Sequence, residues 1–201
     1  FKNKMVWHQD VELPKSDLVV LPGGFSYGDY LRCGSMASKS KIMKSVINFA
    51  NSGGMVMGIC NGFQILVETG LVPGVLLRNK YLEFICKNVF VKIKDKKNTY
   101  FKDIKNDVLE FHIAHNEGNY FCTKDQLKEI EDNDQVANNY CDKDGNTEEQ
   151  FNPNGSIKNI AGIFNKEKNI LGMMPHPERM IDLSLSGEDG SLFFNNLINN
   201  L

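Results

Sequence analysis

The sequence predicts an α/β fold in three layers, with a mostly parallel central sheet, helices on both of its faces and an antiparallel extension. Short apolar runs alternate with helix-like stretches in the first third of the chain. From about Tyr81 onward, longer segments of alternating polar and apolar residues follow, which is typical of antiparallel strands. No repeat or linker divides the 201 residues, so residues 1–201 are expected to form a single domain.

Three apolar runs in the first third are expected to be strands. "KMVWH" (4–8) and "DLVVL" (17–21) are interpreted as short buried strands, and Pro22-Gly23-Gly24 ends the second one. "MVMGI" (55–59) is a continuous apolar run that is too short for a helix, so it is expected to be an internal parallel strand.

Helices are expected between and after these strands. Residues 38–54 carry one apolar stripe at helical spacing, and Gly53-Gly54 ends it. Helical spacing returns after Cys60 and closes at Gly70, and residues 190–201 form a closing helix.

The second half supplies the antiparallel strands. They are expected within residues 81–95, 107–118 and 157–176, where polar and apolar residues alternate. The polar run between them, residues 141–156, is expected to be a surface loop.

Composition excludes several classes of protein. With 23 basic and 25 acidic residues the net charge is −2, so no concentrated basic face is available for nucleic acid or a membrane surface. No apolar run is long enough to span a membrane, and no signal peptide is visible. Five cysteines without a CxxC pair indicate reduced thiols in a cytoplasmic protein, and no Cys/His spacing fits zinc, so no metal is expected.

The segment Gly58-Ile59-Cys60-Asn61-Gly62 has the pattern of a nucleophile elbow with cysteine as the nucleophile. A strand-to-helix turn crowds the side chains, so glycine is needed on either side. The helix N-terminus beyond it is expected to lower the pKa of Cys60, and the Asn61 N–H is placed to bind an oxyanion. A buried thiol in a tight turn is the alternative.

The late segment "GMMPHPER" supplies a candidate base. Prolines on both sides of His176 favour extended backbone, in which residues two apart face the same way. Glu178 can then hold one ring nitrogen of His176 while the other faces a nucleophile. A rigid surface turn with a solvated carboxylate remains the alternative.

The third segment, "LPGGFSYGDYLRCGS", follows a strand end. Paired glycines there let backbone N–H groups approach a ligand, and Gly24 is the best candidate for a second oxyanion donor. Neither GxxxxGK[ST] nor GxGxxG occurs, so the chain has no nucleotide-binding loop. Several side chains of this segment could line a substrate or partner surface, although the two tyrosines could equally be packing residues: Phe25, Tyr27, Asp29, Tyr30 and Arg32.

Together these segments resemble the class I, triad-type glutamine amidotransferases, whose fold is flavodoxin-like. "PGGFSYGDYLR", "CNGFQIL", "AHNEGNYF" and "GMMPHPER" are most similar to the glutaminase components of phosphoribosylformylglycinamidine synthases, enzymes of de novo purine biosynthesis. The resemblance runs from about Val6 to the C-terminal helix. GxCxG and PHPE belong to the wider class, whereas "GGFSYGDYLR" is more specific.

The resemblance implies a mechanism. Cys60 would attack the side-chain amide of glutamine, His176 would move the proton, and Glu178 would orient His176. A γ-glutamyl thioester would form, ammonia would leave, and water would release glutamate. Gly24 and Asn61 would supply the oxyanion hole. The remaining glutamine-binding positions implied by the resemblance are Gln64, His115, Asn116 and Glu117.

The resemblance also implies partners. This chain would carry no cofactor, and ATP and Mg²⁺ would act on a large ATP-dependent synthetase subunit, in some members joined by a small bridging subunit. The family's first strand and helix have no counterpart here, and residues 141–156 look longer than the family's turn. Two alternatives remain: a non-catalytic binding subunit, and a stand-alone hydrolase such as a γ-glutamyl hydrolase or a cysteine peptidase of similar fold.

Overall fold

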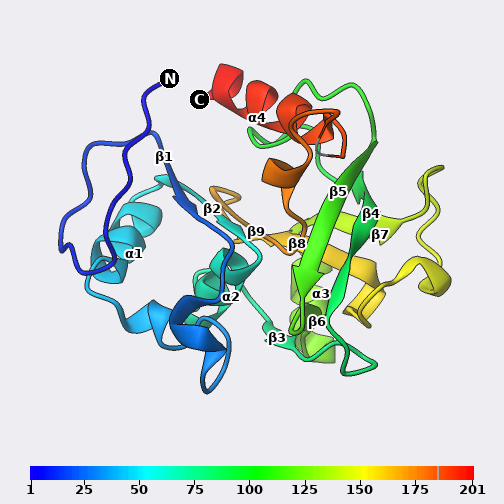
Figure 1. Ribbon diagram of the computed structural model, residues 1–201, viewed down its shortest axis with the longest axis horizontal. Helices are drawn as coiled ribbons and strands as arrows, with labels where there is room; N and C mark the ends of the chain where they lie inside the picture. Colours follow the sequence, from blue (N-terminus) through cyan, green and yellow to red (C-terminus); the bar gives the residue numbers. More distant parts are fainter. Residues whose placement is uncertain (185) are drawn as a thin grey trace.

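The computed structural model describes residues 1–184 and 186–201. Among these residues, the central sheet has seven strands in the order β1-β2-β9-β8-β7-β4-β5 (Figure 1). A second sheet pairs β3 (Val75–Leu77) with β6 (Asn119–Phe121). The strands of the central sheet are β1 (Leu18–Leu21), β2 (Met55–Ile59), β4 (Ile85–Ile93), β5 (Val108–His115), β7 (Val136–Cys141), β8 (Ile160–Phe164) and β9 (Ile170–Met173).

The sheet has a parallel part and a larger antiparallel part. β1 pairs with β2 and β2 with β9 in parallel. The pairs β9–β8, β8–β7, β7–β4 and β4–β5 are all antiparallel. The α/β class and the antiparallel extension are therefore confirmed, but the sheet is not mostly parallel. The reason is that the hairpin β4–β5 and its neighbours add four strands to a parallel core of three.

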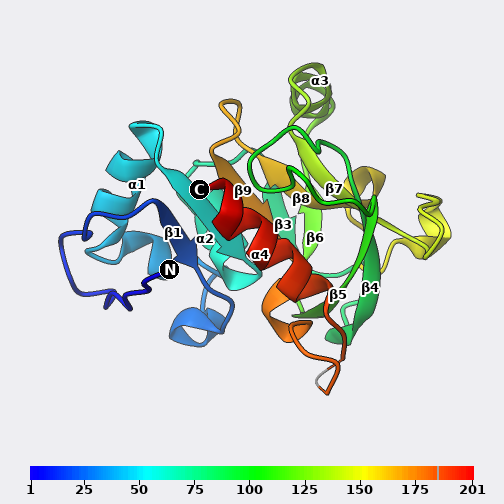
Figure 2. The same cartoon turned by 90° about the horizontal axis from the view of Figure 1, so that it is seen from above.

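Helices cover both faces of the sheet, as the sequence predicts. α4 (Asp189–Asn200) lies over one face and α2 (Asn61–Glu68) over the other (Figures 1 and 2). α1 (Met43–Asn51) contacts β2, and α3 (Lys124–Asp132) precedes β7. None of the helices in the described part of the chain is both long and apolar enough to cross a membrane.

Two expectations near the N-terminus are wrong. Residues 4–8 form no strand, because Met5 and Trp7 are exposed and Trp7 instead joins a turn with Asp10. β1 is an edge strand with Val20 43% exposed, so it is not buried. Apolar, β-branched residues favour a strand only where a neighbouring strand and a second layer cover them.

The segment 141–156 is only in part the predicted surface loop. Residues 148–150 are exposed, but Asn154 and Ser156 are fully buried. Both side chains donate to the carbonyl oxygen of Gly118, at 2.8 and 3.2 Å. The end of the loop is therefore hydrogen-bonded to Gly118, next to residues 115–117, which the resemblance implies bind glutamine.

A buried tyrosine joins the loop before β5 to the parallel core. The Tyr100 hydroxyl lies 2.8 Å from the Val56 carbonyl oxygen and 2.9 Å from that of Asn169. It is fully buried, so water cannot replace these contacts. The parallel strands β2 and β9 are thereby fixed at their N-terminal ends.

Tyr100→Phe is therefore expected to lower the free energy of unfolding by about 1–2 kcal/mol, since it leaves buried carbonyl groups without their donor. Urea unfolding followed by circular dichroism measures this. Tyr81→Phe, at a 69% exposed position, is the matched control and should change stability by less than about 0.5 kcal/mol. Equal effects of the two substitutions would contradict the assigned role of Tyr100.

Candidate active site

The three sequence segments that carry chemistry meet at one edge of the parallel core. Gly23 and Gly24 follow β1, Cys60 follows β2, and His176 lies three residues after β9. Because β1, β2 and β9 are neighbours and parallel, their carboxyl ends lie side by side, where α/β sheets bind ligands. The Cys60 N–H donates to the Met173 carbonyl oxygen at 2.8 Å and so joins two of these ends.

Cys60 has the strained backbone of a nucleophile elbow. Its φ of 50° and ψ of −105° place it outside both strand and helix, between β2 and α2. A Cβ on Gly62 would lie 1.9 Å from the Leu21 carbonyl oxygen, and one on Gly58 would lie 2.7 Å from the Gly62 backbone. No larger residue fits at these two positions, so the close approach that the pattern predicts is present.

His176 and Glu178 form the predicted pair, but the extended backbone expected for this segment is wrong, because Pro177–Arg179 form a short 3-10 helix directly after His176. His176 Nδ1 lies 2.5 Å from the Glu178 carboxylate, so Nδ1 is the donor and Nε2 is the acceptor nitrogen. Nε2 is buried and has no hydrogen-bond partner among the described residues. The His176 N–H donates to the His112 carbonyl oxygen at 2.7 Å, which fixes the turn against β5.

Gly23 brings His176 and Cys60 to a common point. A Cβ on Gly23 would lie 2.6 Å from His176 Cε1 and 3.6 Å from Cys60 Cβ. The imidazole and the Cys60 side chain therefore both lie against the Gly-Gly turn. An orientable base with a free Nε2 next to a nucleophile is the arrangement that covalent catalysis requires.

The resting charge of Cys60 differs from the sequence expectation. Burial raises the pKa of the Cys60 thiol to about 12, although the Asn61 N–H lowers it. The Glu178 carboxylate raises this pKa further, and the Arg179 guanidinium lowers it. The sequence predicts that the helix N-terminus lowers the pKa of Cys60. This prediction is wrong for the free chain, because desolvation of the thiol outweighs the effect of the helix N-terminus. Cys60 rests as a thiol, so attack needs a base to take its proton.

One hydrogen-bond chain runs from the loop after β1 through the start of α2 to the segment after β5. The Asn61 Oδ1 accepts from the Ser26 N–H at 3.2 Å and from the Ser26 hydroxyl. Its Nδ2 donates to Gln64 Oε1 at 2.8 Å, and Gln64 Nε2 donates to the Glu117 carbonyl oxygen at 2.7 Å. Asn61 and Gln64 thus hold the loop after β1 and the segment after β5 in place around Cys60.

Asn79 organises the segment 115–118, although the sequence did not predict this role. Its Oδ1 accepts from the Gly118 N–H and from His115 Nδ1, each at 3.1 Å. Its Nδ2 donates to the carbonyl oxygens of Glu83 and His115. These partners are mostly main-chain groups assembled by the tertiary fold, so no sequence signal marks Asn79 beyond its place in a turn after an apolar run.

The other predicted binding residues lie near this segment. His115 is 2% exposed, and its Nε2 is buried without a partner among the described residues. Glu117 is half-buried with its carboxylate 3.8 Å from Arg78 Nε, and Asn116 is exposed. Gly24 adjoins open space, since a Cβ at this position would have no described atom within 4 Å. The contacts of these residues with glutamine remain predictions.

The loop after β1 leaves aromatic side chains in solvent. Tyr30 is 73% exposed, so it is not a packing residue, and Phe25 is also exposed. Arg32 pairs with Glu68 at 2.7 Å. Within the part of the chain that the structure describes, no group of three His, Cys, Asp or Glu side chains is arranged to hold a metal ion.

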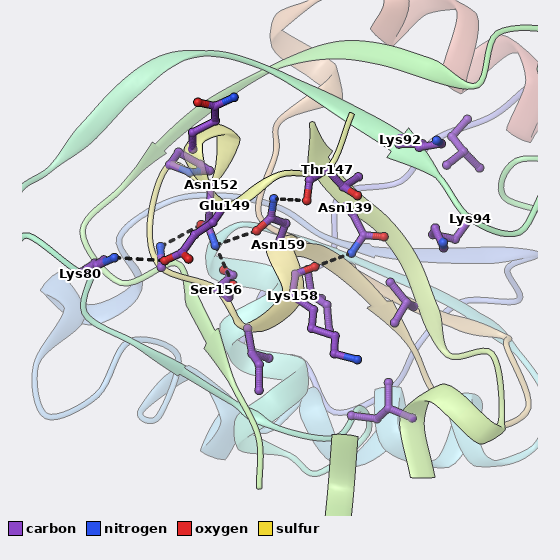
Figure 3. A pocket seen from close by; sticks show the side chains of 18 of the residues that line it. Lys80, Lys92, Lys94, Asn139, Thr147, Glu149, Asn152, Ser156, Lys158 and Asn159 are labelled. Carbon is purple, nitrogen blue, oxygen red and sulfur yellow. Dashed lines mark hydrogen bonds and ion pairs between the residues drawn. The ribbon is translucent and has the colours of Figure 1, made fainter. Parts of the chain in front are cut away.

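A broad groove lies apart from these residues, over the antiparallel part of the sheet. Its volume is about 2240 Å³, and lysine and asparagine side chains such as Lys92, Lys94 and Asn139 line it (Figure 3). Many of its polar groups are already paired, as in the 3.4 Å contact of Lys80 with Glu149. None of the predicted site residues, all of which the structure describes, lines this groove.

The fold and the site define a class of protein. The chain matches the family described as CobB/CobQ-like glutamine amidotransferase domain over residues 3–187. It therefore belongs to this family.

Closely similar proteins carry one particular name. The chain is 80% identical to the phosphoribosylformylglycinamidine synthase subunit PurQ of Pelagibacter ubique, over all of this chain and 88% of that protein. It is 50% identical to PurQ of Synechocystis sp., over 95% of this chain and 86% of that one. The structure of PurLQS from Thermotoga maritima matches with a TM-score of 0.81 and 38% identity, over 94% of this chain and 82% of that chain. The resemblance inferred from the sequence is confirmed.

Glu178→Gln should lower the kcat for glutamate release by roughly 10²–10⁴-fold, because the neutral amide no longer stabilises a protonated His176. The assay is glutamate formation from glutamine, and circular dichroism checks that the fold is retained. Glu188→Gln, at an exposed position before α4, is the matched control and should retain activity. Full activity of Glu178→Gln would show that Glu178 does not act on His176.

His115 is expected to make stability depend on pH. Burial lowers the pKa of His115 to about 4, from an ordinary 6.5. Between about pH 6.5 and 4, His115 is therefore protonated in the unfolded chain but not in the folded chain. The free energy of unfolding falls as the pH falls through this range. His115→Asn keeps a donor for Asn79 Oδ1 but takes up no proton in this pH range. The loss of unfolding free energy between these pH values should therefore be smaller by about 3 kcal/mol in this variant. Urea unfolding of both proteins at several pH values measures the difference, and parallel curves would contradict it.

Proposed function

We propose that this chain is the glutaminase component of phosphoribosylformylglycinamidine synthase. It hydrolyses glutamine to glutamate and delivers ammonia for the conversion of formylglycinamide ribonucleotide to formylglycinamidine ribonucleotide. The observation that carries the proposal is the His176–Glu178 pair beside the Cys60 elbow. The 80% identity to a PurQ subunit supports it, because such identity extends over the entire chain.

We assign each member of the triad a role, which the geometry supports. His176 Nε2, the acceptor nitrogen, takes the proton of the Cys60 thiol as sulfur attacks the side-chain amide carbon of glutamine. Nε2 then gives that proton to the leaving nitrogen, and ammonia departs from the γ-glutamyl thioester. Water attacks the thioester with His176 again as base, which releases glutamate and restores the thiol. Glu178 holds Nδ1 and stabilises the imidazolium that forms.

The oxyanion is stabilised by backbone donors. The Asn61 N–H already interacts with the Cys60 sulfur and lies at the start of α2, where the helix dipole adds partial positive charge. The Gly24 N–H is the second donor. The side chains of His115 and Gln64, with the backbone of residues 116–117, form the wall that receives the amino-acid end of glutamine.

The synthetase chemistry belongs to a partner. The chain has no nucleotide-binding loop, so ATP, Mg²⁺ and the ribonucleotide bind to a large synthetase subunit, with a small subunit bridging the two. The similarity to a chain of PurLQS from Thermotoga maritima supports this partnership. The protein acts in the cytoplasm, which its five free cysteines support.

Cys60→Ala should abolish glutamate release, both alone and with the synthetase, while the fold is retained. The wild-type chain alone should release glutamate slowly and should accelerate when the synthetase is added, because the buried thiol of the free chain is protonated. Cys122→Ala, which changes a buried thiol away from the triad and from the predicted glutamine-binding residues, is the matched control.

Three outcomes would contradict the proposal. Glutamate release by Cys60→Ala would place the nucleophile elsewhere. Full activity without a synthetase would favour a stand-alone hydrolase. No glutamate release by the wild type with its synthetase would favour a non-catalytic binding subunit.

A further inference from the structure

A second cysteine has a histidine beside it. Cys86 lies on β4 and His112 on β5, neither of them part of the triad, and Cys86 Sγ is 3.4 Å from His112 Nε2. Cys86 is exposed, whereas Cys122 and Cys141 are buried in the core. The proposed glutaminase mechanism uses neither side chain.

An asparagine orients this histidine. Asn88 lies directly opposite His112 in the β4–β5 ladder, and its Oδ1 is 3.0 Å from His112 Nδ1. The Asn88 Nδ2 donates to Glu110 Oε1 at 3.1 Å, which fixes which end of the amide faces the ring. Since an amide oxygen only accepts, Nδ1 must carry the proton and Nε2 must be the acceptor. The Cys86 thiol therefore donates its proton to His112 Nε2.

The surroundings disfavour a resting proton on His112. Burial lowers the pKa of His112, the charges of Arg179 and His176 lower it further, and the Glu178 carboxylate raises it, so the net shift leaves Nε2 free to accept the hydrogen bond of the Cys86 thiol. Cys33 is a contrasting thiol, because burial and its carboxylate neighbours Glu117 and Asp29 raise its pKa far above the ordinary value. The neighbours of Cys33 thus oppose a thiolate, whereas the neighbour of Cys86 is a base.

Open space adjoins Cys86. Cys86 lines the groove over the antiparallel strands, together with Phe84 and Lys87 (Figure 3 shows the groove). A small molecule can therefore reach the sulfur, whereas Cys60 is 5% exposed. Accessibility and a neighbouring base are the two properties that make a thiol reactive.

We propose that Cys86, His112 and Asn88 form a surface thiol site, distinct from the triad, that undergoes exchange with low-molecular-weight disulfides. His112 Nε2 takes the Cys86 proton, and the thiolate attacks one sulfur of the disulfide R–S–S–R. The bond Cys86–S–S–R forms, the original sulfur–sulfur bond breaks, and the leaving thiolate takes the proton from His112. The product is a mixed disulfide, which a free thiol reverses by the same route.

The site lies next to the catalytic segments. The His112 carbonyl oxygen accepts from the His176 N–H at 2.7 Å. Cys86 pairs with Ala114, whose carbonyl oxygen is 3.8 Å from Cys60 Sγ. Strand β5 therefore lies between a group attached to Cys86 and the Cys60 thiol.

The test uses the full reduced chain and the aromatic disulfide DTNB at pH 7. Released thionitrobenzoate gives the rate, and peptide mass mapping identifies the modified thiol. The fastest equivalent should map to Cys86 and react roughly tenfold or more faster than Cys33. A fastest equivalent at Cys33 or Cys60 would overturn the proposal.

Substitutions separate base assistance from simple exposure. His112→Gln should slow the reaction of Cys86 about tenfold, whereas His8→Gln, at a histidine that contacts Trp7 instead, should not change it. Asn88→Ala should also slow it. The double substitution Asn88→Asp/Glu110→Gln keeps an acceptor for His112 Nδ1 without placing two carboxylates side by side, and it should restore the rate. Thermal unfolding confirms that each variant is folded. Rates unchanged in both His112→Gln and Asn88→Ala would overturn the proposal.

Discussion

The parallel pairing of β1, β2 and β9 is the constraint on which the site depends. Met57 lies opposite Val20 on one side and Leu171 on the other, so the three strands end at the same edge. The Gly-Gly turn, Cys60 and His176 come from three distant parts of the chain, and this register brings them to the same edge. Tyr100 reinforces it at the opposite end of the strands.

Close backbone packing of two helices against the strand ends fixes the positions of Cys60 and His176. The approach of Gly62 to the Leu21 carbonyl oxygen places α2 directly against β1, which forces Cys60 into its positive-φ conformation. On the other side, a Cβ on Gly190 would lie 1.8 Å from the Pro177 carbonyl oxygen, so α4 is packed directly under the catalytic turn. Cys60 and His176 are thus held by two helices on opposite faces of the sheet (Figure 2).

Burial and reactivity oppose one another at Cys60. The same packing that aims the sulfur removes it from water, and desolvation raises the pKa of the thiol to about 12. The free chain consequently holds a protected thiol. A protonated thiol is protected from oxidation, to which a permanently ionised thiolate would be open. An enzyme that works through a thioester benefits from this protection if glutamine and a partner subunit complete the site. Cys86 shows the contrast, since it is exposed and has a histidine beside it.

The α/β class, the elbow at Cys60 and the pairing of His176 with Glu178 could all be predicted from the amino-acid sequence. They depend on local rules: glycine at crowded turns, proline-restricted backbone and hydrophobic periodicity. The antiparallel majority of the sheet, the edge position of β1 and the roles of Asn79 and Ser26 could not be predicted in this way. Each of them depends on main-chain groups that are distant in the sequence, as in the contacts of Asn79 with His115 and Gly118. The helix N-terminus beside Cys60 can be recognised from a few consecutive residues. The protonation of Cys60 cannot be recognised in this way, because the desolvation of its thiol depends on every segment that covers the sulfur in the folded chain.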